Sequence, residues 1–429
     1  MNTESKPILL IITASYPFSI AAEATFLAPE IQRYRGYFSR IVLVPQDVRG
    51  VRSPIPDDVV VDTSLAEGLQ AMRRLPLFMM GILSKGFYSE LWKHPWLMKN
   101  PSAVLRMALN RGRVEWMVGW FQRLQISSQN QVPIVVFAFW LDTAFLAAGI
   151  SRMRGGRAGL VARAHGGDLY AERHSPPHIP FQEEMIALAD YIAPDSTAGA
   201  SYLRHKYPHH ASKIEAALLG TDDPGFRTAA SADGVVRMVS CAFLVDVKRI
   251  DLLVRGIAVL AEKHKDLAIE WTHFGDGPLM PEISALANSC LPSQVLWHLK
   301  GHTETRDIYN WYREKPVDVF INVSSSEGTP VSIMEAISCS IPVIATCVGG
   351  NQEIVNDALG RLIPAEASAQ DVAVAIEKVC LIGQDRERLK QGARAQWESR
   401  YSADNNYSAF RSLLSKDLSY HSNRTIKVR

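Results

Sequence analysis

The chain lacks several features that would place it in a common class of protein. Its 429 residues include five cysteines, which are odd in number and scattered without Cys-x-x-Cys spacing, so no disulfide framework and no zinc or redox motif is indicated. The formal net charge is only +2, which argues against a nucleic acid as the partner. No apolar run approaches the roughly 20 residues that a helix needs to span a membrane.

The first residues also lack the pattern of a secretory signal. Met1–Lys6 leads directly into Pro7–Thr13, a predicted strand, so no cleavable signal segment is indicated. The cysteines fall mostly in predicted core elements, where buried and reduced thiols are expected. These features predict a cytoplasmic protein. With 47% hydrophobic and 21% charged residues, the composition is that of a globular chain long enough for two domains of about 200 residues each.

Short apolar runs alternate with longer periodic or polar stretches in both halves of the chain. This pattern predicts an α/β fold with parallel sheets and crossover helices. Turn-forming residues cluster between Asp222 and Gly234, where we predict the domain boundary. The closing residues 369–416 are predicted to be helical. The predicted strands are 8–12, 41–44, 134–139, 160–164 and 191–193 in the first half, and 237–241, 268–274, 295–299, 319–323 and 343–345 in the second.

The most informative stretch runs from Glu327 to Glu335 and follows a predicted buried strand at 318–323. Thr329 is expected to be the N-cap of a helix and Pro330 its first residue. Such a helix start directs free backbone N–H groups and the positive end of the dipole above the strand, where a phosphate could sit. The two carboxylates would repel phosphate, but a carboxylate can accept two hydrogen bonds from a vicinal diol of a sugar. Two solvated glutamates beside an ordinary turn are the alternative.

Residues 336–355 continue this stretch as a predicted helix, a break, a strand that begins with Pro342-Val343, and the turn Gly349-Gly350 into another helix. Two glutamates separated by seven residues, then a Pro-Val strand and a Gly-Gly turn, resemble the donor-binding half of the retaining glycosyltransferases of family 4. The resemblance, to the glycosyl transferases group 1 of bacterial surface-polysaccharide type, implies a GT-B fold of two Rossmann-like domains whose parallel sheets face a central cleft. It implies that Glu327 contacts the transferred sugar and that Glu335 holds the nucleotide ribose.

The same resemblance assigns a diphosphate-binding role to the loop after the predicted strand 237–241. Lys248 is the candidate that neutralises the phosphates. Five residues earlier the family has an arginine, and this chain has Phe243. Either Arg249 or another cation replaces that arginine, or binding depends more on the helix N-terminus.

Further donor-binding residues are implied at neighbouring strand ends. Gly275 and Gly277, in a Gly-Asp-Gly-Pro turn, are expected to let the backbone turn tightly beside the nucleotide. The segment 297–301, which includes Leu299, is expected beside the nucleobase. The predicted helix start completes the donor site with Gly328, Thr329, Pro330 and Val331.

In the first half, His165 and Asp168 follow a predicted strand and match the family's His-Gly-x-Asp motif. Because the carboxyl ends of parallel strands carry the ligand sites of such sheets, we expect both in the catalytic centre, with His165 near the reacting sugar. The loop 13–18 with Glu23 resembles the first loop of polysaccharide-type members, except that Ala21-Ala22 replaces the usual Gly-Gly. That replacement leaves phosphate contact by this loop open.

An insertion at 71–124 combines aromatic and basic side chains. Nine lysines and arginines stand against Glu90 and Glu115, and four tryptophans are interleaved with them. This combination suits an anionic membrane surface. A packed crossover helix pair with a solvated basic face is the alternative. The nine cations are Arg73, Arg74, Lys85, Lys93, Lys99, Arg106, Arg111, Arg113 and Arg123, and the tryptophans are Trp92, Trp96, Trp116 and Trp120.

The predicted organisation is an acceptor-binding domain at 1–225, a donor-binding domain at 226–400, and a C-terminal helix at 401–429 that crosses back to the first domain. No Asp-x-Asp cluster stands at a predicted strand end, so we expect no metal and no cofactor in the transfer reaction. The donor is expected to be a UDP- or GDP-sugar.

The predicted function is a retaining transfer of a hexose-type sugar to a glycan or lipid-linked acceptor. The expected products are capsule, exopolysaccharide or lipopolysaccharide, assembled at the inner face of the plasma membrane. Two alternatives stay open. One is a non-catalytic scaffold that binds nucleotide sugars, and the other is a GT-B enzyme of another reaction, such as an epimerase or a phosphorylase.

Overall fold

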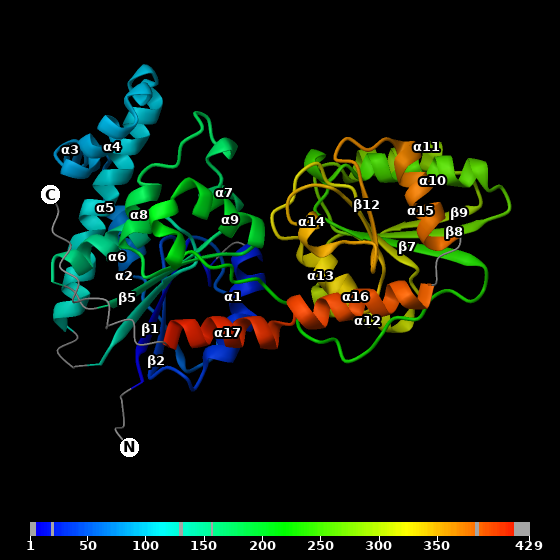
Figure 1. Cartoon of the computed structure of the whole chain (residues 1–429), viewed down its shortest axis with the longest axis horizontal. Coiled ribbons are helices and arrows are strands. Elements are labelled where there is room, and N and C mark those ends of the chain that lie inside the picture. The colour runs from blue at the N-terminus through cyan, green and yellow to red at the C-terminus, as the bar shows by residue number, and fades with distance from the viewer. Residues whose placement is uncertain (1–5, 19–20, 128–131, 156–157, 382–385, 416–429) are drawn as a thin grey trace. The chain divides into compact units, whose positions relative to one another are not determined.

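A computed structural model of the chain describes residues 6–18, 21–127, 132–155, 158–381 and 386–415 (Figure 1). The chain forms two compact units, of which unit 1 comprises residues 1–218 and 407–429 and unit 2 comprises residues 219–406. The predicted polar start at 1–5 and the last part of the predicted terminal helix, 416–429, lie outside the described residues. Among the described residues, no helix has the length and apolar character that crossing a membrane requires.

Unit 1 contains a six-stranded parallel sheet with the strand order β3-β2-β1-β4-β5-β6. The five predicted apolar runs of the first half are confirmed as strands, and they are buried as a sheet covered by helices requires. The short strand β3 was not predicted, because three residues show no periodicity. The strands are β1 (Ile8–Thr13), β2 (Arg40–Pro45), β3 (Val59–Val61), β4 (Ile134–Ala138), β5 (Ala158–Ala164) and β6 (Tyr191–Pro194).

The helices of unit 1 connect these strands. The start of α6 is fixed by Asp142, whose Oδ1 accepts hydrogen bonds from the backbone N–H groups of Ala144 and Phe145. The described helices between the strands are α1 (Ala21–Tyr34), α2 (Ser64–Ala71), α6 (Thr143–Met153), α7 (Gly166–Leu169), α8 (Gln182–Leu188) and α9 (Thr197–Lys206), with the 3-10 helices η2 (Ala171–Arg173) and η3 (Pro208–Lys213).

The insertion between β3 and β4 is helical. It contains α3 (Arg74–Ile82), α4 (Lys85–Lys93), the 3-10 helix η1 (Pro95–Lys99) and the long α5 (Pro101–Ser127). Glycines bring α3 and α5 into backbone contact. A Cβ atom at Gly81 would lie 1.9 Å from the carbonyl oxygen of Ala108, and one at Gly112 would lie 1.8 Å from that of Leu77. Only glycine permits this approach, so the helices of the insertion form one packed body.

Part of the predicted basic and aromatic surface of the insertion is internal. Arg111 is 5% exposed, and its Nη1 lies 2.8 Å from Oε2 of Glu184. Trp120 is buried and donates a hydrogen bond to Oγ of Ser64, and Trp116 packs against the hydrophobic core. These three side chains therefore do not belong to a surface that could meet a membrane, because α5 packs against α2, α3 and α6.

Unit 2 contains a second six-stranded parallel sheet, with the order β12-β11-β10-β7-β8-β9. All five predicted strands of this half are confirmed, and β12 was not predicted. The strands are β7 (Val235–Cys241), β8 (Ala268–Phe274), β9 (Val295–Leu299), β10 (Val319–Asn322), β11 (Val343–Thr346) and β12 (Gly360–Ile363).

The helices of unit 2 follow its strands in alternation, as in a Rossmann-like fold. The described ones are the 3-10 helix η4 (Asp246–Lys248), α10 (Ile250–Lys263), α11 (Met280–Cys290), α12 (Thr305–Glu314), α13 (Val331–Ser338), α14 (Asn351–Ile354), α15 (Ala369–Cys380) and α16 (Arg386–Arg400). The two predicted α/β halves are thus two parallel-sheet domains of six strands each.

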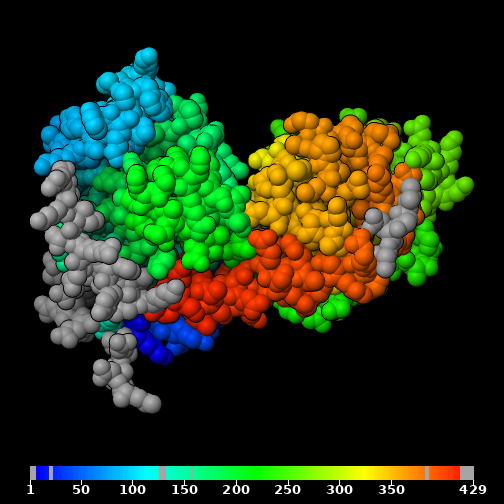
Figure 2. Space-filling view, in the orientation of Figure 1, coloured from blue at the N-terminus to red at the C-terminus, as the bar shows by residue number. Residues whose placement is uncertain are grey.

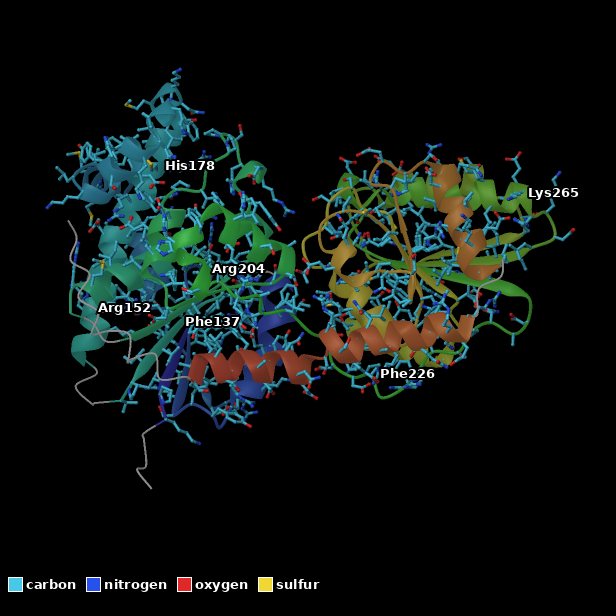
Figure 3. The ribbon with its side chains drawn as sticks, in the orientation of Figure 1. Phe137, Arg152, His178, Arg204, Phe226 and Lys265 are labelled. Carbon is cyan, nitrogen blue, oxygen red and sulfur yellow. The ribbon has the colours of Figure 1, made fainter. Side chains whose placement is uncertain are left out.

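The last described helix, α17 (Ala403–Ser415), returns the chain to unit 1 from Tyr407 onward. The ring of Phe410 lies 5.1 Å from that of Phe137 in β4, which Figure 3 labels. The guanidinium group of Arg163 lies 4.3 Å from the centre of the Phe410 ring. Arg163 is also paired with Glu30 at 2.5 Å, and both side chains are fully buried. The C-terminal helix therefore completes the core of unit 1.

Candidate active site

The carboxylate of Glu327 is held at the carboxyl end of β10 by three side-chain donors. Its Oε1 lies 2.6 Å from Nζ of Lys248, 2.6 Å from Oγ of Ser324 and 3.1 Å from Nδ2 of Asn322. The side chain of Glu327 is 9% exposed, so these donors replace the water that would solvate its charge. The structure thus brings together two predicted site residues, Lys248 and Glu327, that are far apart in the sequence.

The lysine that reaches Glu327 is itself accessible. The side chain of Lys248 is 23% exposed, and an ammonium group has three donors, of which Glu327 occupies one. A phosphate oxygen can therefore join the same ammonium group without breaking the ion pair. The phosphate-binding role of Lys248 stays a prediction.

Arg249, one of the predicted replacements for the missing arginine, donates hydrogen bonds to backbone carbonyl groups. Its Nε donates to the carbonyl oxygen of Val323 at 2.8 Å, and its Nη2 donates to those of Ser324 and Ala365 at 3.3 and 2.8 Å. Its φ of 47° lies in the left-handed region. These donors are not available to a phosphate, so Arg249 fixes the backbone at the end of β10.

The Gly-Gly turn packs directly on the backbone that carries Glu327. A Cβ atom at Gly349, whose φ is +44°, would lie 1.9 Å from the carbonyl oxygen of Glu327, and one at Gly350 would lie 2.1 Å from that of Gly328. The N–H of Gly350 also donates to the carbonyl of Gly328 at 3.0 Å. The Gly349-Gly350 turn and the segment that begins at Glu327, which are separate motifs in the sequence, are therefore in direct backbone contact.

The helix after Glu327 begins one residue later than predicted. Pro330, with φ −78° and ψ 90°, is the N-cap of α13, and Val331 is the first helical residue. The expectation that Thr329 caps the helix is wrong, because the extended ψ of Pro330 leaves this residue outside the helix. Gly328 is exposed and has no heavy atom within 4 Å of the position of a Cβ, so the loop before the helix is open to a ligand.

Glu335 lies on α13 in apolar surroundings. Burial raises the pKa of its carboxyl to about 7, although a hydrogen bond from Thr305 lowers it. The pKa values of the neighbouring Cys241 and Tyr309 are raised by burial first and by the charge of Glu335 second. An isolated carboxylate with few partners is suited to receive the donors of a ligand, such as the hydroxyl groups of a ribose.

Gly275 and Gly277 form a tight turn after β8. Their φ angles are +131° and +157°, and Cβ atoms would lie 1.9 Å from the carbonyl oxygen of Ala242 and 2.4 Å from that of Leu244. The N–H of Gly275 donates to the carbonyl oxygen of Gly301 at 2.9 Å. The turn therefore joins the loops after β7, β8 and β9, where the predicted Leu299 ends its strand.

Phe243 stands where the family has a phosphate-binding arginine. Its side chain is 60% exposed at the loop that follows β7. A solvent-exposed ring at this position can stack on a planar group but supplies no positive charge. Lys248 and the backbone donors therefore stay the predicted phosphate ligands of unit 2.

In unit 1, His165 follows β5 and is enclosed by aromatic rings. Its ring centre lies 4.6 Å from that of Phe139 and 4.6 Å from that of Trp140. Burial, with a contribution from Arg163, lowers the pKa of His165 to about 3, so the imidazole is neutral at neutral pH. Neither ring nitrogen has a hydrogen-bond partner among the described residues. A buried imidazole whose nitrogens have no protein partner can form hydrogen bonds with a polar ligand.

Asp168 supports the segment around His165. Its carboxylate accepts hydrogen bonds from the N–H of His165 at 2.5 Å and from the N–H of Leu141 at 2.7 Å. Burial raises the pKa of Asp168 to about 7 although these two donors lower it. This geometry makes Asp168 a positioning residue that ties the start of α7 to the loop between β4 and α6.

The first loop of unit 1 is closed by Glu23. The carboxylate accepts the N–H groups of Ala14, Ser15 and Tyr16, each at 2.8 Å, and the indole N–H of Trp140 at 2.6 Å. Three convergent N–H groups can bind an anion, and in this loop the anion that they bind is the carboxylate of Glu23. The loop therefore offers these donors to Glu23 rather than to a phosphate.

Several residues of the site were not predicted. Asn322 and Ser324 hold Glu327, and Thr305 is the partner of Glu335. The available signal was the polar Asn322 at the carboxyl end of an apolar strand, where parallel sheets place their ligand groups. Thr305 carries no such signal, because its approach to Glu335 depends on how α12 packs.

Comparison with known proteins finds similar glycosyltransferases. Residues 228–396 match the family described as Glycosyl transferases group 1. The GtfA subunit of the UDP-N-acetylglucosamine–peptide N-acetylglucosaminyltransferase of Streptococcus pneumoniae is 31% identical over 168 residues, which are 38% of this chain and 31% of that protein. WcaL of Salmonella typhimurium, which is assigned to colanic acid biosynthesis, is 23% identical over 269 residues, or 61% of this chain and 65% of WcaL. The chain thus spans less than two thirds of each of these relatives.

Two solved structures cover nearly the whole chain. The lipopolysaccharide outer core galactosyltransferase WaaB has a TM-score of 0.64 and 14% identity over 95% of this chain and 99% of its own. Anabaena HepE, in complex with UDP and glucose, has a TM-score of 0.59 and 15% identity with the same coverage. The chain therefore has the GT-B fold of glycosyltransferases. Within that class, it carries a glycosyl transferases group 1 domain at residues 228–396.

Proposed function

We propose that this protein is a retaining glycosyltransferase that moves a hexose-type sugar from a nucleoside-diphosphate sugar to a glycan or lipid-linked acceptor in surface-polysaccharide assembly. The observation that carries the proposal is the Glu327 carboxylate, which Lys248, Ser324 and Asn322 fix at the end of β10 within the group 1 domain. A carboxylate with a fixed orientation can hold the hydroxyl groups of one sugar. Relatives named for UDP, glucose and colanic acid support the substrate class.

In the proposed reaction, the residues of unit 2 bind the donor. Lys248 neutralises the diphosphate, and the backbone N–H groups at the start of α13 add to its effect. Glu327 orients the transferred sugar, and Glu335 accepts the hydroxyl groups of the ribose. The donors on the protein supply the charge that the leaving diphosphate needs, so we assign no metal to this step.

His165 is assigned to the transferred sugar from unit 1. The neutral imidazole can accept one hydrogen bond and donate another, which matches a sugar hydroxyl. Asp168 fixes the backbone of His165 and thereby its orientation. The product keeps the α configuration of the donor.

The test is incubation of the purified chain with UDP- and GDP-sugars, with thermal stability and release of free sugar as the two readouts. A bound donor at about 100 times its dissociation constant adds roughly 2.7 kcal/mol to stability. Slow hydrolysis of one donor, lost in Glu327→Ala, supports an enzyme. Binding without any hydrolysis or transfer favours the scaffold alternative, and the anomeric configuration of a product decides retention.

The two glutamates can be separated by titration with the free nucleoside diphosphate. Glu335→Ala is expected to weaken nucleotide binding, whereas Glu327→Ala is expected to lower turnover with little change in nucleotide affinity. The reason is that the free nucleotide contains the ribose but not the transferred sugar. Equal losses of nucleotide affinity in both variants would contradict this division of roles.

We also propose that the insertion contacts an anionic membrane. Eight of the fourteen large hydrophobic side chains that are exposed among the described residues lie between Leu75 and Leu105. Trp92 is 84% exposed and Trp96 is 42% exposed. Exposed cations flank them, including Arg73, Arg74 and Lys85. Figure 2 shows the surface that this segment forms on unit 1, in blue and cyan. Tryptophan with neighbouring cations favours the interface of an anionic bilayer.

Sedimentation with vesicles that contain phosphatidylglycerol tests this contact. Attraction to anionic lipid is worth about 1 kcal/mol for each nearby lysine or arginine, so binding should decrease with salt. The triple variant Arg73→Glu, Arg74→Glu, Lys85→Glu should lose binding. A matched triple reversal of exposed cations in unit 2, at Lys265, Arg306 and Lys315, should retain it. Equal binding by both variants would contradict the proposal.

A further inference from the structure

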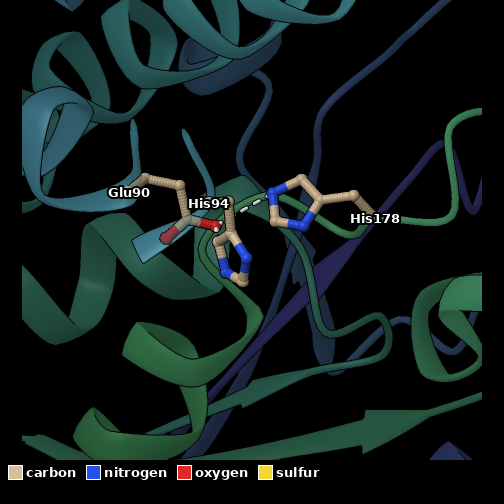
Figure 4. A group of neighbouring side chains, drawn as sticks. All are labelled: Glu90, His94 and His178. Carbon is tan, nitrogen blue, oxygen red and sulfur yellow. Dashed lines mark ion pairs between the residues drawn. The ribbon is translucent and has the colours of Figure 1, made fainter. Parts of the chain in front are cut away.

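Three side chains with metal-binding atoms meet in unit 1, apart from the residues assigned to sugar transfer (Figure 4). Glu90 lies in α4, His94 follows the last residue of that helix, and His178 lies in the segment between η2 and α8. One ligand atom from each residue lies within 4.8 Å of the other two. The cluster therefore joins the insertion to a segment about 85 residues further along the chain.

The separations within the cluster match a coordination shell. Nε2 of His178 lies 3.0 Å from Oε1 of Glu90, and Nε2 of His94 lies 3.9 Å from the same oxygen. In a tetrahedral site with bonds of about 2.0–2.1 Å, neighbouring ligand atoms are about 3.3 Å apart. These two values lie on either side of this distance, and the third separation, between the two imidazoles, is within 4.8 Å, so the imidazoles must approach one another to share an ion.

The surroundings of the cluster are those of a site that is closed on one side. The side chains of Glu90 and His178 are 7% and 10% exposed, and the buried Nε2 of His178 is paired with Oε1 of Glu90 at 3.0 Å. The N–H of Phe181 donates to Oε1 of Glu90 at 2.9 Å, which orients the carboxylate. His94 is 36% exposed, so an ion and a water molecule can reach the cluster from its side.

We propose that Glu90, His94 and His178 bind a divalent transition-metal ion, with a water molecule as the fourth ligand. Two imidazoles and one carboxylate favour Zn²⁺, because Mg²⁺ and Ca²⁺ prefer ligand sets made of oxygen alone. The site would tie α4 and η1 to the segment between η2 and α8. The site is separate from the proposed transfer reaction, since its ligands are none of the residues assigned to donor or sugar.

Calorimetric titration of the chelator-treated full chain with ZnCl₂ tests the proposal. The measurement is made in a Cys347→Ser background, so that this exposed thiol does not contribute. We expect one Zn²⁺ per chain, a rise in Tm with Zn²⁺, and the absorption bands of tetrahedral Co²⁺ when Co²⁺ replaces it. Removal of an outer-sphere partner costs about 10–100-fold in affinity, so loss of a direct ligand should cost more than about 100-fold.

Three single variants and one control make the outcome decisive. Glu90→Gln, His94→Gln and His178→Gln should each lose the tight site. Gln at position 90 can still accept the N–H of Phe181, and position 94 is partly exposed, so the variants are expected to fold, which circular dichroism checks. His174→Gln, on the same segment and exposed, should bind Zn²⁺ like the unmodified chain. Absence of stoichiometric binding, or unchanged affinity in His94→Gln and His178→Gln, would overturn the proposal.

Discussion

Substitution of Glu335 by glutamine should stabilise the protein at high pH and weaken its binding of nucleotide. The carboxyl has a pKa of about 7 in the folded chain against an ordinary value of 4.5, and the main cause is burial. Below the ordinary value, the group is protonated in both states and has no effect. As pH rises from 4.5 to about 7, the unfolded chain loses the proton and the folded chain keeps it, so stability falls. Above pH 7 the loss is complete.

The magnitude follows from the same two values. A rise from 4.5 to about 7 corresponds to about 3 kcal/mol, because each pKa unit is worth about 1.4 kcal/mol. Glu335 keeps some accessible surface, so solvent screens part of this energy and we expect about 2 kcal/mol. For a unit of this size, that corresponds to roughly 4–8 °C in Tm.

Thermal denaturation of the unmodified chain and of Glu335→Gln at pH 5 and pH 8 measures this effect. The variant should melt at a higher temperature at pH 8, and the difference should be less than about 1 kcal/mol at pH 5. Glu366→Gln, an exposed site in the same unit, is the control and should shift neither curve. A stability difference between the variant and the unmodified chain that is the same at both pH values would refute the burial argument. Tighter nucleotide binding by the variant would refute the ribose assignment.

Three further outcomes follow from the contacts described above. Lys248→Ala should weaken nucleotide binding by several kcal/mol, as for removal of one partner of a desolvated charge pair, and unchanged affinity in a titration would place the phosphate anchor elsewhere. Gly349→Ala should destabilise unit 2 by about 1–3 kcal/mol and lower donor binding, while Gly328→Ala, where a Cβ meets open space, should leave the stability unchanged; denaturant unfolding distinguishes them. Phe410→Ala should destabilise unit 1 by about 3–5 kcal/mol in the same assay, and no change would mean that α17 is not needed by its core.

The sequence predicts most of the sheets because their strands are apolar on both faces and separated by turn-forming residues. The runs 268–274 and 295–299 coincide with β8 and β9. Strands β3 and β12 were missed because they have three and four residues, and a run that short carries no periodic signal.

The sequence predicts those parts of the site whose residues lie close together in the chain. Glu327 and the glycines of the 349–350 turn could be found from their spacing, but the contact between them could not, since it depends on β10 and β11 being neighbours in the sheet. For the same reason, the sequence does not predict that Arg249 binds the carbonyl oxygen of Val323 or that Arg111 pairs with Glu184, because both contacts depend on tertiary packing. A residue type and its spacing identify a charge, whereas its partner is set by packing.

Because α17 belongs to unit 1 from Tyr407 onward, this unit can complete its core only after unit 2 has been synthesised. On a ribosome, the sheet of unit 1 leaves the exit tunnel first, yet Phe410, which covers Phe137 and Arg163, is made only after all of unit 2. At about 5–20 residues per second, the intervening segment of roughly 190 residues takes about 10–40 s to synthesise. Unit 2, by contrast, is continuous in the sequence. The first half of this chain to be translated is therefore the last to reach its native core.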